Sequence, residues 1–375
     1  MELGDTRDAQ EAGAVAPETL IDWDRLLDRP RIPIEREVLA AAFAGRRVAI
    51  TGAGGSLGRA LALCVADERP ASLTLIDSGE ASLFALRDRL LAAGHAEATF
   101  GFRLADVRNR RRVAAIFATT RPEIVFHLAA YKHVPWAEIE PSEYLDANLG
   151  GGRVVIEEAA QIGAARVVYP STDKAVNPPS LYGATKRIIE AQLREVAARS
   201  ATRCVAARFV NVLGSQGSTG VTFARRITEG QPLPITDLAM TRYWIAPHHG
   251  TLLLAYAAAP AFDGPFTVLL PDALPAVPVV EIARRIWRQL GNAGDPPIVV
   301  IGSRPGERLH EELTGGGEAY EPGPHRGILE VRGMGEAGPG TPIAEGIGAL
   351  LAAIDGGAGE DELKARALAW AHAIR

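Results

Sequence analysis

Two of the chain's four lysines, Lys174 and Lys186, lie in one short stretch, STDKAVNPPSLYGATKR. Lysine, unlike arginine, can lose its proton when it is desolvated or placed beside another charge. Tyr182 stands four residues before Lys186, a spacing that puts both side chains on one face of a helix. Because a nearby ammonium lowers the pKa of a phenol, the pair predicts a tyrosine that acts as a general base. Taken alone, the same spacing also occurs in helices that serve only structure.

Three polar residues precede this pair. Thr172, Asp173 and Lys174 follow the run ARVVYP and fall at the carboxyl end of an expected strand, where open α/β sheets bind ligands. An acid beside a potential base suits an elimination of water. Asp173 would protonate a departing hydroxyl, Lys174 would remove a proton next to a ketone, and Thr172 would orient them. The alternative is an Asp–Lys ion pair at the surface.

A glycine-rich segment, VAITGAGGSLGRALALCVA, begins as an apolar strand and runs into a helix. Glycine lets the backbone turn tightly and approach a pyrophosphate, whose charge the helix N-terminus favours. The residues predicted to form this dinucleotide site are Gly52, Gly54, Gly55, Ser56, Leu57 and Gly58.

Acidic residues follow the next two expected strands. Asp77 ends SLTLID, where a carboxylate can accept hydrogen bonds from the adenosine ribose. An acid there repels a 2′-phosphate, so NAD is expected, with NADP as the alternative. Asp106 and Val107 follow the third strand, at a position suited to the adenine edge. Both acids have the simpler alternative role of ending a strand.

The elements around these motifs alternate between β-branched runs and helical stretches, which predicts an α/β protein with a Rossmann-type, doubly wound parallel sheet. Strands are expected at 46–51, 72–77, 98–106, 123–130, 165–172, 203–212 and 266–270. Helices are expected at 57–66, 80–92, 110–119, 143–162, 182–198, 279–290, 344–354 and 361–375. The expected units are an N-terminal extension (1–45, disordered at its start), a dinucleotide-binding domain (46–213), a smaller, mainly substrate-binding domain (214–332) and a C-terminal helical tail (333–375).

Composition narrows the class of protein. The 375 residues are 47% hydrophobic and 23% charged, and the net charge of -5 argues against a nucleic-acid binder, which would present a basic face. Cys64 and Cys204 lie in apolar segments without metal or redox spacing, so no metal site is expected and a reducing cytoplasm fits. We recognise no signal peptide and no apolar run of the ~18 to 20 residues that a membrane helix needs. A cytoplasmic protein without a membrane span is therefore expected.

The motifs together resemble bacterial UDP-N-acetylglucosamine 4,6-dehydratases of the polysaccharide-biosynthesis and flagellin-glycosylation type, which are extended short-chain dehydrogenases/reductases. The resemblance runs from about Asp28 to Leu313 through TGAGGSLG, HLAAYKHVP, STDKAVNPPSLYGATKR, RFVNVLGSQGS, TRYW and RPGERLHEEL. It implies oxidation of the sugar at C4, loss of water across C5 and C6, and return of the hydride to C6. Lys174 stands where relatives that act on other hexoses usually carry glutamate, so it looks like the mark of the N-acetylglucosamine branch.

Further site residues follow from the resemblance alone. Lys132 would bind near the cofactor and the sugar, and Asn148 would order the site or serve only structure. The diphosphate of the substrate would meet Asn211, Arg242 and Arg304, and Glu307 would meet the uridine ribose. A guanidinium suits phosphate because it donates two parallel hydrogen bonds. The remaining residues implied to line the cofactor are Ala129, Ala130, Tyr131, Tyr182 and Lys186.

Several alternatives stay open. Tyr182 is similar to the enzymes that invert C5, whereas the lead-in and LIDSGEASLF are similar to a mostly retaining group. A UDP-sugar epimerase would need the tyrosine, the lysine and the cofactor but no loss of water, and a non-catalytic dinucleotide-sensing protein would need none of the catalytic residues. Many relatives carry membrane helices ahead of this domain, whereas this chain looks like a soluble version. The fold commonly forms homo-oligomers.

Overall fold

The computed structural model describes residues 17–29, 32–215, 217–262, 264–273, 275–333 and 342–374. Most of the segment expected to be disordered, residues 1–16, lies outside these ranges. Within the part of the chain that is described, no helix is both long enough and apolar enough to cross a membrane.

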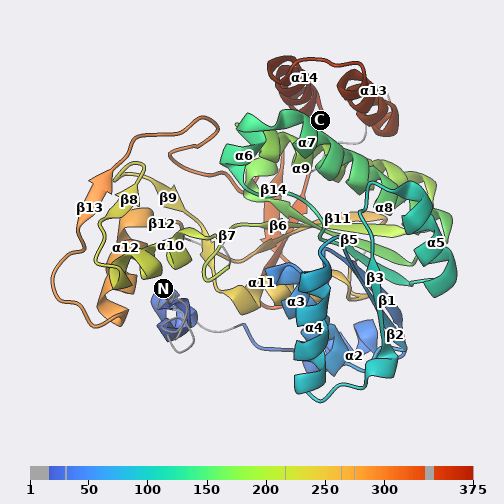
Figure 1. The fold of residues 1–375 in the computed structure, drawn as a ribbon, viewed down its shortest axis with the longest axis horizontal. Helices are drawn as coiled ribbons and strands as arrows, with labels where there is room; N and C mark the ends of the chain where they lie inside the picture. Colours follow the sequence, from blue (N-terminus) through green and yellow to red (C-terminus); the bar gives the residue numbers. More distant parts are fainter. Residues whose placement is uncertain are drawn as a thin grey trace, which may run out of the picture.

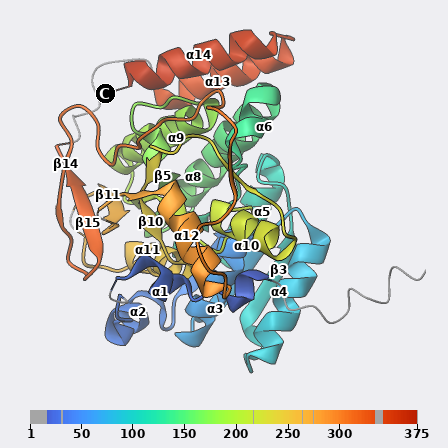
Figure 2. The ribbon, with the colours of Figure 1, turned by 90° about the vertical axis from the view of Figure 1, so that its left-hand side faces the viewer.

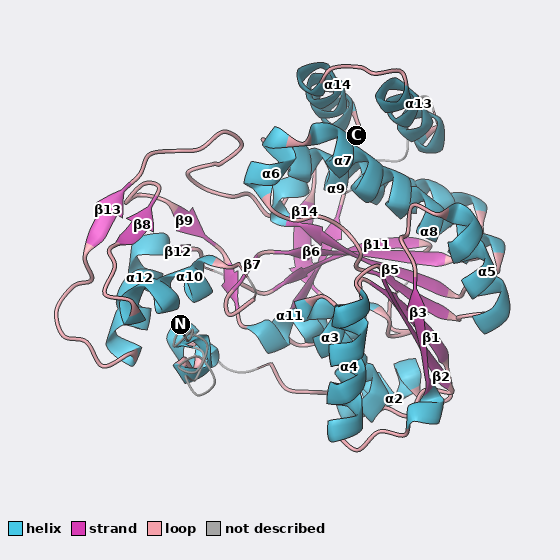
Figure 3. Ribbon diagram, in the orientation of Figure 1, coloured by secondary structure: helices cyan, strands magenta, loops and turns pink. Residues whose placement is uncertain are grey.

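A nine-stranded sheet forms the centre of the molecule (Figures 1 and 3). Its strands are β1 (Arg47–Thr51), β2 (Ser72–Asp77), β3 (Phe100–Leu104), β4 (Ile124–His127), β5 (Arg166–Thr172), β6 (Arg203–Phe209), β11 (Phe266–Pro271), β14 (Ala319–Pro322) and β15 (Ile328–Arg332). Their order is β14-β15-β11-β6-β5-β4-β1-β2-β3. The strands from β11 to β3 run parallel, and β15 and β14 complete one edge antiparallel.

Helices cover both faces of this sheet (Figure 1). One face carries α2 (Arg36–Phe43), α3 (Ser56–Asp67), α4 (Glu80–Ala92) and α11 (Pro247–Ala257), and the other carries α5 (Arg110–Thr120), α8 (Gly151–Gln161) and α9 (Leu181–Arg199). All of β4 is buried, as expected for a parallel strand covered on both faces. The predicted doubly wound, Rossmann-type fold is confirmed. The strand order reverses between β1 and β4, and ligands bind such sheets at the carboxyl ends beside this point.

Two helical groups complete the large body. The helices α13 (Ile343–Asp355) and α14 (Glu360–Ala373) pack outside α9, at the top of Figure 2. Near them, α6 (Val134–Ile139) and α7 (Pro141–Leu145) follow β4. Short 3-10 turns cover Pro17–Leu20, Glu97–Thr99 and Asp173–Ala175.

A second, smaller core lies on the left of Figure 1. It is built by α1 (Trp23–Leu27), α10 (Thr219–Thr228) and α12 (Val279–Gln289), whose buried side chains include Leu26, Phe223 and Ile282. Three two-stranded pairs border it: β7 (Asn211–Val212) with β10 (Trp244–Ile245), β8 (Leu233–Ile235) with β13 (Ile298–Val300), and β9 (Thr241–Arg242) with β12 (Val277–Pro278). The N-terminal lead-in therefore packs beside segments from the second half of the chain.

Two expected elements are interrupted. The strand expected at 203–212 ends at Phe209, because β7 leaves the large sheet and pairs with β10. The helix expected at 143–162 contains a π-helical turn, Asp146–Gly150, between α7 and α8. Such turns are rare and are often found at functional sites. The helices α6, α10 and α11 are not among the predicted elements.

Candidate active site

The glycine-rich segment joins β1 to α3 and lies against the end of β4. Gly52 has a φ of 67°, and a Cβ added there would lie 2.6 Å from the backbone nitrogen of Ala129. A Cβ on Gly58 would lie 2.2 Å from the carbonyl oxygen of Gly52. Only glycine therefore allows the loop, the helix and the β4 end to approach so closely. Gly55, the N-cap of α3, forms no side-chain capping hydrogen bond, so the helix presents its first N–H groups as an anion-binding end.

A cavity of about 500 Å³ opens beside this loop at the carboxyl ends of the strands. The predicted cofactor residues that line it are Gly52, Gly54, Gly55, Asp77, Asp106, Val107, Ala129, Ala130 and Tyr131. Ser56, Leu57 and Gly58 form the first turn of α3 next to it. The tight glycine turn, the uncapped helix end and the carboxylates of Asp77 and Asp106 at the strand ends fit a dinucleotide. A second cavity, of about 400 Å³, contains none of the site residues predicted from the sequence.

Asp77 holds the loop as well as lining the cavity. Its Oδ2 accepts a hydrogen bond from the Gly54 amide at 2.9 Å, and its Oδ1 accepts one from the Gly79 amide at 2.8 Å. Each carboxylate oxygen can accept more than one hydrogen bond, so a ribose hydroxyl can still be bound. Asp106 forms an ion pair with Arg108 at 2.7 Å, and this guanidinium lowers the pKa of Asp106.

Replacing Gly58 by alanine is expected to weaken cofactor binding and lower stability by about 1 to 3 kcal/mol, because the added methyl group meets backbone that cannot yield cheaply. Gly316→Ala is the control, since a Cβ there meets nothing within 4 Å. Thermal unfolding and dinucleotide titration of both variants provide the measurement. Equal behaviour of the two variants would show that the loop tolerates a side chain.

Asp77→Ala is expected to weaken NAD binding by roughly tenfold or more, because the ribose loses the hydrogen bonds of a charged acceptor. NADP binding should fall less, because the substitution also removes the charge that repels a 2′-phosphate. Titration of both dinucleotides, with thermal unfolding as a check on the loop, measures the difference. An equal loss of affinity for NAD and NADP would mean that Asp77 acts by holding the loop rather than by binding the ribose.

The catalytic stretch predicted from the sequence begins at the end of β5. The Thr172 hydroxyl donates a hydrogen bond of 2.9 Å to Asp173 Oδ1, and Lys174 Nζ lies 3.1 Å from the same oxygen. Asp173 and Lys174 thus form an ion pair, as in the structural alternative, but the side chain of Asp173 is fully buried and that of Lys174 is 19% exposed. Burial lowers the pKa of Lys174, but the charges of Asp173 and Glu311 more than compensate and raise it above its ordinary value. Lys174 is therefore an ammonium in this arrangement.

Tyr182 and Lys186 lie in the first turns of α9, which Ser180 caps by accepting a hydrogen bond from the Gly183 amide. Burial raises the pKa of Tyr182 to about 12, against the lowering effects of Lys174 and a hydrogen bond with Thr172. Burial also lowers the pKa of Lys186 to about 7. The groups that lower the pKa of Tyr182 in this arrangement are Lys174 and Thr172, and the effect of Lys186 on this phenol stays a prediction. Lys186 Nζ donates to the Pro170 carbonyl at 2.9 Å.

Asn148 connects the cavity to α9. Its side chain accepts a hydrogen bond from the Tyr131 amide at 2.8 Å and donates to the Tyr131 carbonyl at 3.1 Å and to the Thr185 hydroxyl at 3.2 Å. Tyr131 lines the cavity, and Thr185 precedes Lys186. The π-helical turn carries Asn148 and so places it where it can bridge these two parts.

The residues expected to contact the substrate lie in several separate segments of the chain. A Cβ on Gly306 would lie 2.9 Å from Ser180 Cβ, so the segment holding Arg304 and Glu307 lies against the start of α9. Glu307 accepts hydrogen bonds from Thr236 and from the Arg304 amide, each at 3.3 Å. The side chain of Arg304 is exposed to solvent. Lys132 is partly desolvated, which lowers the pKa of its amine.

Asn211 and Arg242 are already engaged with the protein itself. Asn211 donates to the Tyr243 carbonyl at 3.2 Å. The buried guanidinium of Arg242 donates to the carbonyls of Thr241, Leu309 and Arg308 at 2.8, 3.2 and 2.8 Å. Its Nε also lies 3.5 Å from Glu311. Arg242 is thus placed to hold the segment before Glu311, and a direct contact with a diphosphate would require some of these donors to be released.

Glu311 is a buried residue of this site that the motif assignments did not single out. Its Oε1 lies 3.3 Å from Lys174 Nζ, and its side chain is 3% exposed. No signal in the sequence separates Glu311 from the adjacent Glu312 in RPGERLHEEL, because only the tertiary structure shows that Glu311 is buried.

Residues 48–332 match the family described as polysaccharide biosynthesis protein. The chain belongs to this family. It is 34% identical to the probable polysaccharide biosynthesis protein EpsC of Bacillus subtilis (strain 168) over 79% of its own length and 49% of that protein, so it spans about half the length of this relative. It is 30% identical to a UDP-N-acetylglucosamine 4,6-dehydratase (inverting) of Campylobacter jejuni, with coverage of 74% and 80%. The crystal structure of Pen from Bacillus thuringiensis has a TM-score of 0.66 and 29% identity, with coverage of 72% and 84%. The family inferred from the motifs is confirmed.

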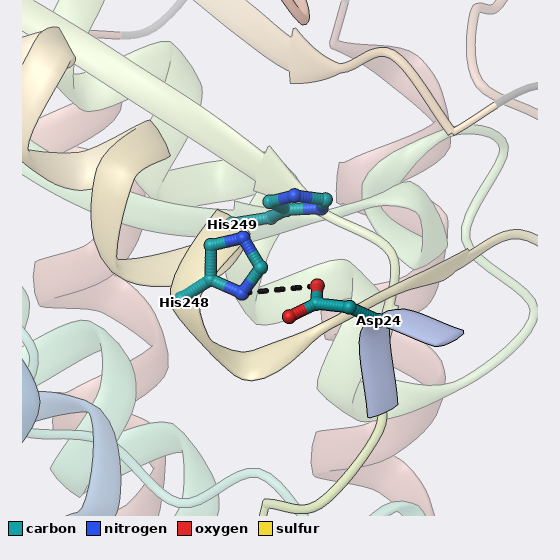
Figure 4. A group of neighbouring side chains, drawn as sticks. All are labelled: Asp24, His248 and His249. Carbon is teal, nitrogen blue, oxygen red and sulfur yellow. Dashed lines mark ion pairs between the residues drawn. The ribbon is translucent and has the colours of Figure 1, made fainter. Parts of the chain in front are cut away.

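This member of the polysaccharide biosynthesis protein family also carries a cluster of Asp24, His248 and His249, shown in Figure 4. Their possible ligand atoms lie within 4.8 Å of one another, and His248 Nδ1 is 3.2 Å from Asp24 Oδ1. The Ile32 amide donates to His249 Nε2 at 3.3 Å, which uses that lone pair. The partial positive charge at the start of α11 also disfavours a bound cation. We therefore interpret the cluster as a contact that joins α1 to α11.

Proposed function

We propose that the chain is a nucleotide-sugar 4,6-dehydratase that acts on UDP-N-acetylglucosamine with NAD, or alternatively NADP. The observation that carries the proposal is the buried Asp173–Lys174 pair, held at the end of β5 beside Tyr182. A buried acid and amine side by side serve little purpose in a protein that only binds a dinucleotide, because desolvating two charges is costly. The membership of the polysaccharide biosynthesis protein family supports this class of substrate.

The cofactor would occupy the cavity beside the glycine-rich segment. When bound, the nicotinamide supplies a site that accepts a hydride from the sugar and later returns it. Gly52, Gly54 and Gly55 would leave room for the pyrophosphate, and Asp77 would accept hydrogen bonds from the adenosine ribose. Asn148 would keep Tyr131 and the start of α9 in register, so that the cofactor and Tyr182 meet the same sugar carbon.

Tyr182 would remove the proton from the C4 hydroxyl. The high pKa that burial gives this phenol means that the free tyrosine holds its proton near neutral pH. Lys174 opposes this effect, because its ammonium favours the phenolate. A positively charged ligand in the adjoining cavity would act in the same direction. Binding would therefore prepare the base.

Asp173 and Lys174 start in the wrong protonation states for an elimination, and one proton transfer corrects both. As an ion pair, the carboxylate cannot protonate a leaving hydroxyl and the ammonium cannot take a proton from C5. If one proton passes from Lys174 Nζ to Asp173 Oδ1 across the 3.1 Å contact, an N–H bond breaks and an O–H bond forms. The resulting amine can take the C5 proton, and the resulting acid can give its proton to the departing C6 oxygen. The net charge of the buried site is unchanged by this exchange.

The UDP group would lie along the segment after β13, which faces the start of α9. Arg304 is exposed and carries no ion pair among the described residues, so its guanidinium is suited to phosphate. Glu307 would meet the uridine ribose. Asn211 and Arg242 would order this end of the site, and Lys132 would lie between the cofactor and the sugar.

Incubation with UDP-N-acetylglucosamine tests the proposal directly. A dehydratase forms a product lighter by one water, and NMR of the keto sugar also reports the C5 configuration. Unchanged mass with altered proton couplings would identify the epimerase instead. A protein that binds a dinucleotide but never converts the sugar would support the sensing alternative.

A further inference from the structure

Glu311 completes a buried cluster of four charged side chains, one of which is Lys174. Lys174 Nζ lies 3.1 Å from Asp173 Oδ1 and 3.3 Å from Glu311 Oε1, and Arg242 Nε lies 3.5 Å from the same glutamate oxygen. The side chains come from three separate parts of the chain: the end of β5, β9 and the segment after β13. Two carboxylates balance two cations, so removing any one of these side chains leaves a buried charge without its partner.

Two oxygens of the cluster are left without donors. Asp173 Oδ2 and Glu311 Oε2 are buried, and neither accepts a hydrogen bond from any described residue. A buried acceptor without a donor costs roughly 1 to 3 kcal/mol, and more when it is charged. A sugar hydroxyl could supply a donor to either oxygen. Both orphaned oxygens belong to the two acids that hold Lys174, which ties them to the reacting part of the site.

We propose that Glu311 is a positioning residue of the reaction, which holds the Lys174 side chain against Asp173 and connects it, through Arg242, to the segment that binds the substrate. This inference rests on the proposed dehydratase function. Glu311 does not contact the reacting atoms of the sugar. It acts by fixing the position of the Lys174 amine and how readily this amine gives up its proton.

Arg242 links the charged cluster to the segment that holds Arg304 and Glu307. Arg242 donates to the carbonyls of Arg308 and Leu309, which precede Glu311, while Arg304 and Glu307 lie just before them. A displacement of this segment by the UDP group would therefore be transmitted to the contact between Glu311 and Lys174.

The charges that face Lys174 determine the expected direction of a pH effect. Asp173 and Glu311 favour the ammonium, Arg242 disfavours it, and the neutral phenol of Tyr182 lies nearby. Glu311→Gln removes one favourable charge and keeps the shape of the side chain. Lys174 should then lose its proton at a pH lower by roughly 1 to 3 units.

The small number of lysines makes the titration of Lys174 measurable by NMR. Lysine labelled with ¹³C at Cε gives four signals in this chain, and the Lys174 signal is assigned by its absence in Lys174→Arg. We expect its titration midpoint to fall in Glu311→Gln and to stay at the wild-type value in Glu312→Gln. Glu312 is the matched control, since it is the adjacent acid and its side chain is 53% exposed. Glu311→Asp, which keeps the charge, should restore most of the wild-type midpoint.

Equal Lys174 midpoints in folded Glu311→Gln and Glu312→Gln would overturn the inference. If Glu311→Gln does not fold, the titration of Lys174 in the wild-type protein tests the inference instead. A Lys174 midpoint at or below the ordinary lysine value of 10.5 would mean that the carboxylates do not hold the amine. The titration of Lys174 requires no turnover, so its result is valid even if the protein does not convert UDP-N-acetylglucosamine. A failure to convert this sugar would refute the proposed function but not the role of Glu311. If it is converted, the acidic limb of C5 hydrogen exchange should move to lower pH in Glu311→Gln by the same amount as the midpoint.

Discussion

Lys174→Arg is expected to lower the rate of dehydration about 100- to 10,000-fold while leaving the fold and dinucleotide binding intact. Arginine keeps the positive charge between Asp173 and Glu311, but it cannot release a proton at any accessible pH. The variant should therefore still oxidise C4 and then stall before the C5 proton is removed. Reaction in D₂O, followed by mass spectrometry and NMR of the recovered sugar nucleotide, measures deuterium at C5. The absorbance of reduced nicotinamide in a single turnover shows whether oxidation persists.

Comparison of Lys174→Ala with Lys174→Arg separates the effect of the positive charge from the effect of proton transfer. Without the ammonium, Asp173 and Glu311 remain as buried acids, which we expect to cost about 3 to 5 kcal/mol of stability. Both Lys174 variants should lack C5 exchange, but only the alanine variant should show a large fall in unfolding temperature. Deuterium appearing at C5 at the wild-type rate in Lys174→Arg would remove Lys174 as the base.

Tyr182→Phe is expected to block the reaction one stage earlier, with a loss of about 100- to 10,000-fold. The variant lacks the oxygen that would take the C4 proton, so oxidation itself should fail and no reduced nicotinamide should accumulate in a single turnover. Its fold should persist, because the ring still fills the same space. The contrast with Lys174→Arg, which should accumulate the reduced form, assigns the two residues to different steps.

Tyr169→Phe is the control for this prediction. Tyr169 is fully buried beneath Lys186, whose Nζ lies 4.4 Å from the centre of its ring, and its hydroxyl has no hydrogen-bond partner among the described residues. Removing that hydroxyl should leave activity unchanged and stability unchanged or slightly higher. Activity retained in Tyr182→Phe, measured beside this control, would exclude Tyr182 as the base.

The parts of the site that were predictable are those carried by contiguous residues. The order of strands and helices follows from hydrophobic periodicity, and the glycine-rich segment and the Tyr182–Lys186 spacing are local patterns, so each can be recognised without knowledge of the tertiary structure. Asp77 could be placed at the cavity because the carboxyl ends of neighbouring parallel strands meet at one edge of the sheet.

The remaining features depend on contacts between distant segments. Glu311 enters the site because the segment after β13 folds back over β5 and β9, and no periodic pattern records that contact. The break at Val210 also depends on tertiary structure, since no Gly or Pro interrupts the run RCVAARFVNV, while Asn211 pairs with Trp244 in another sheet. The protonation states of Tyr182 and Lys186 depend on burial, which pairwise spacing does not reveal.

The position of α1 has a consequence for the nascent chain. Leu26 and Leu27 leave the ribosome early, yet their partners in the second core include Phe223 and Ile282, which are synthesised much later. At roughly 5 to 20 residues per second, this leaves the apolar face of α1 uncovered for on the order of 10 s or longer. The central sheet can begin to assemble during that time from β1 to β6. The helix α1 thus completes its packing only after α10 and α12 have emerged.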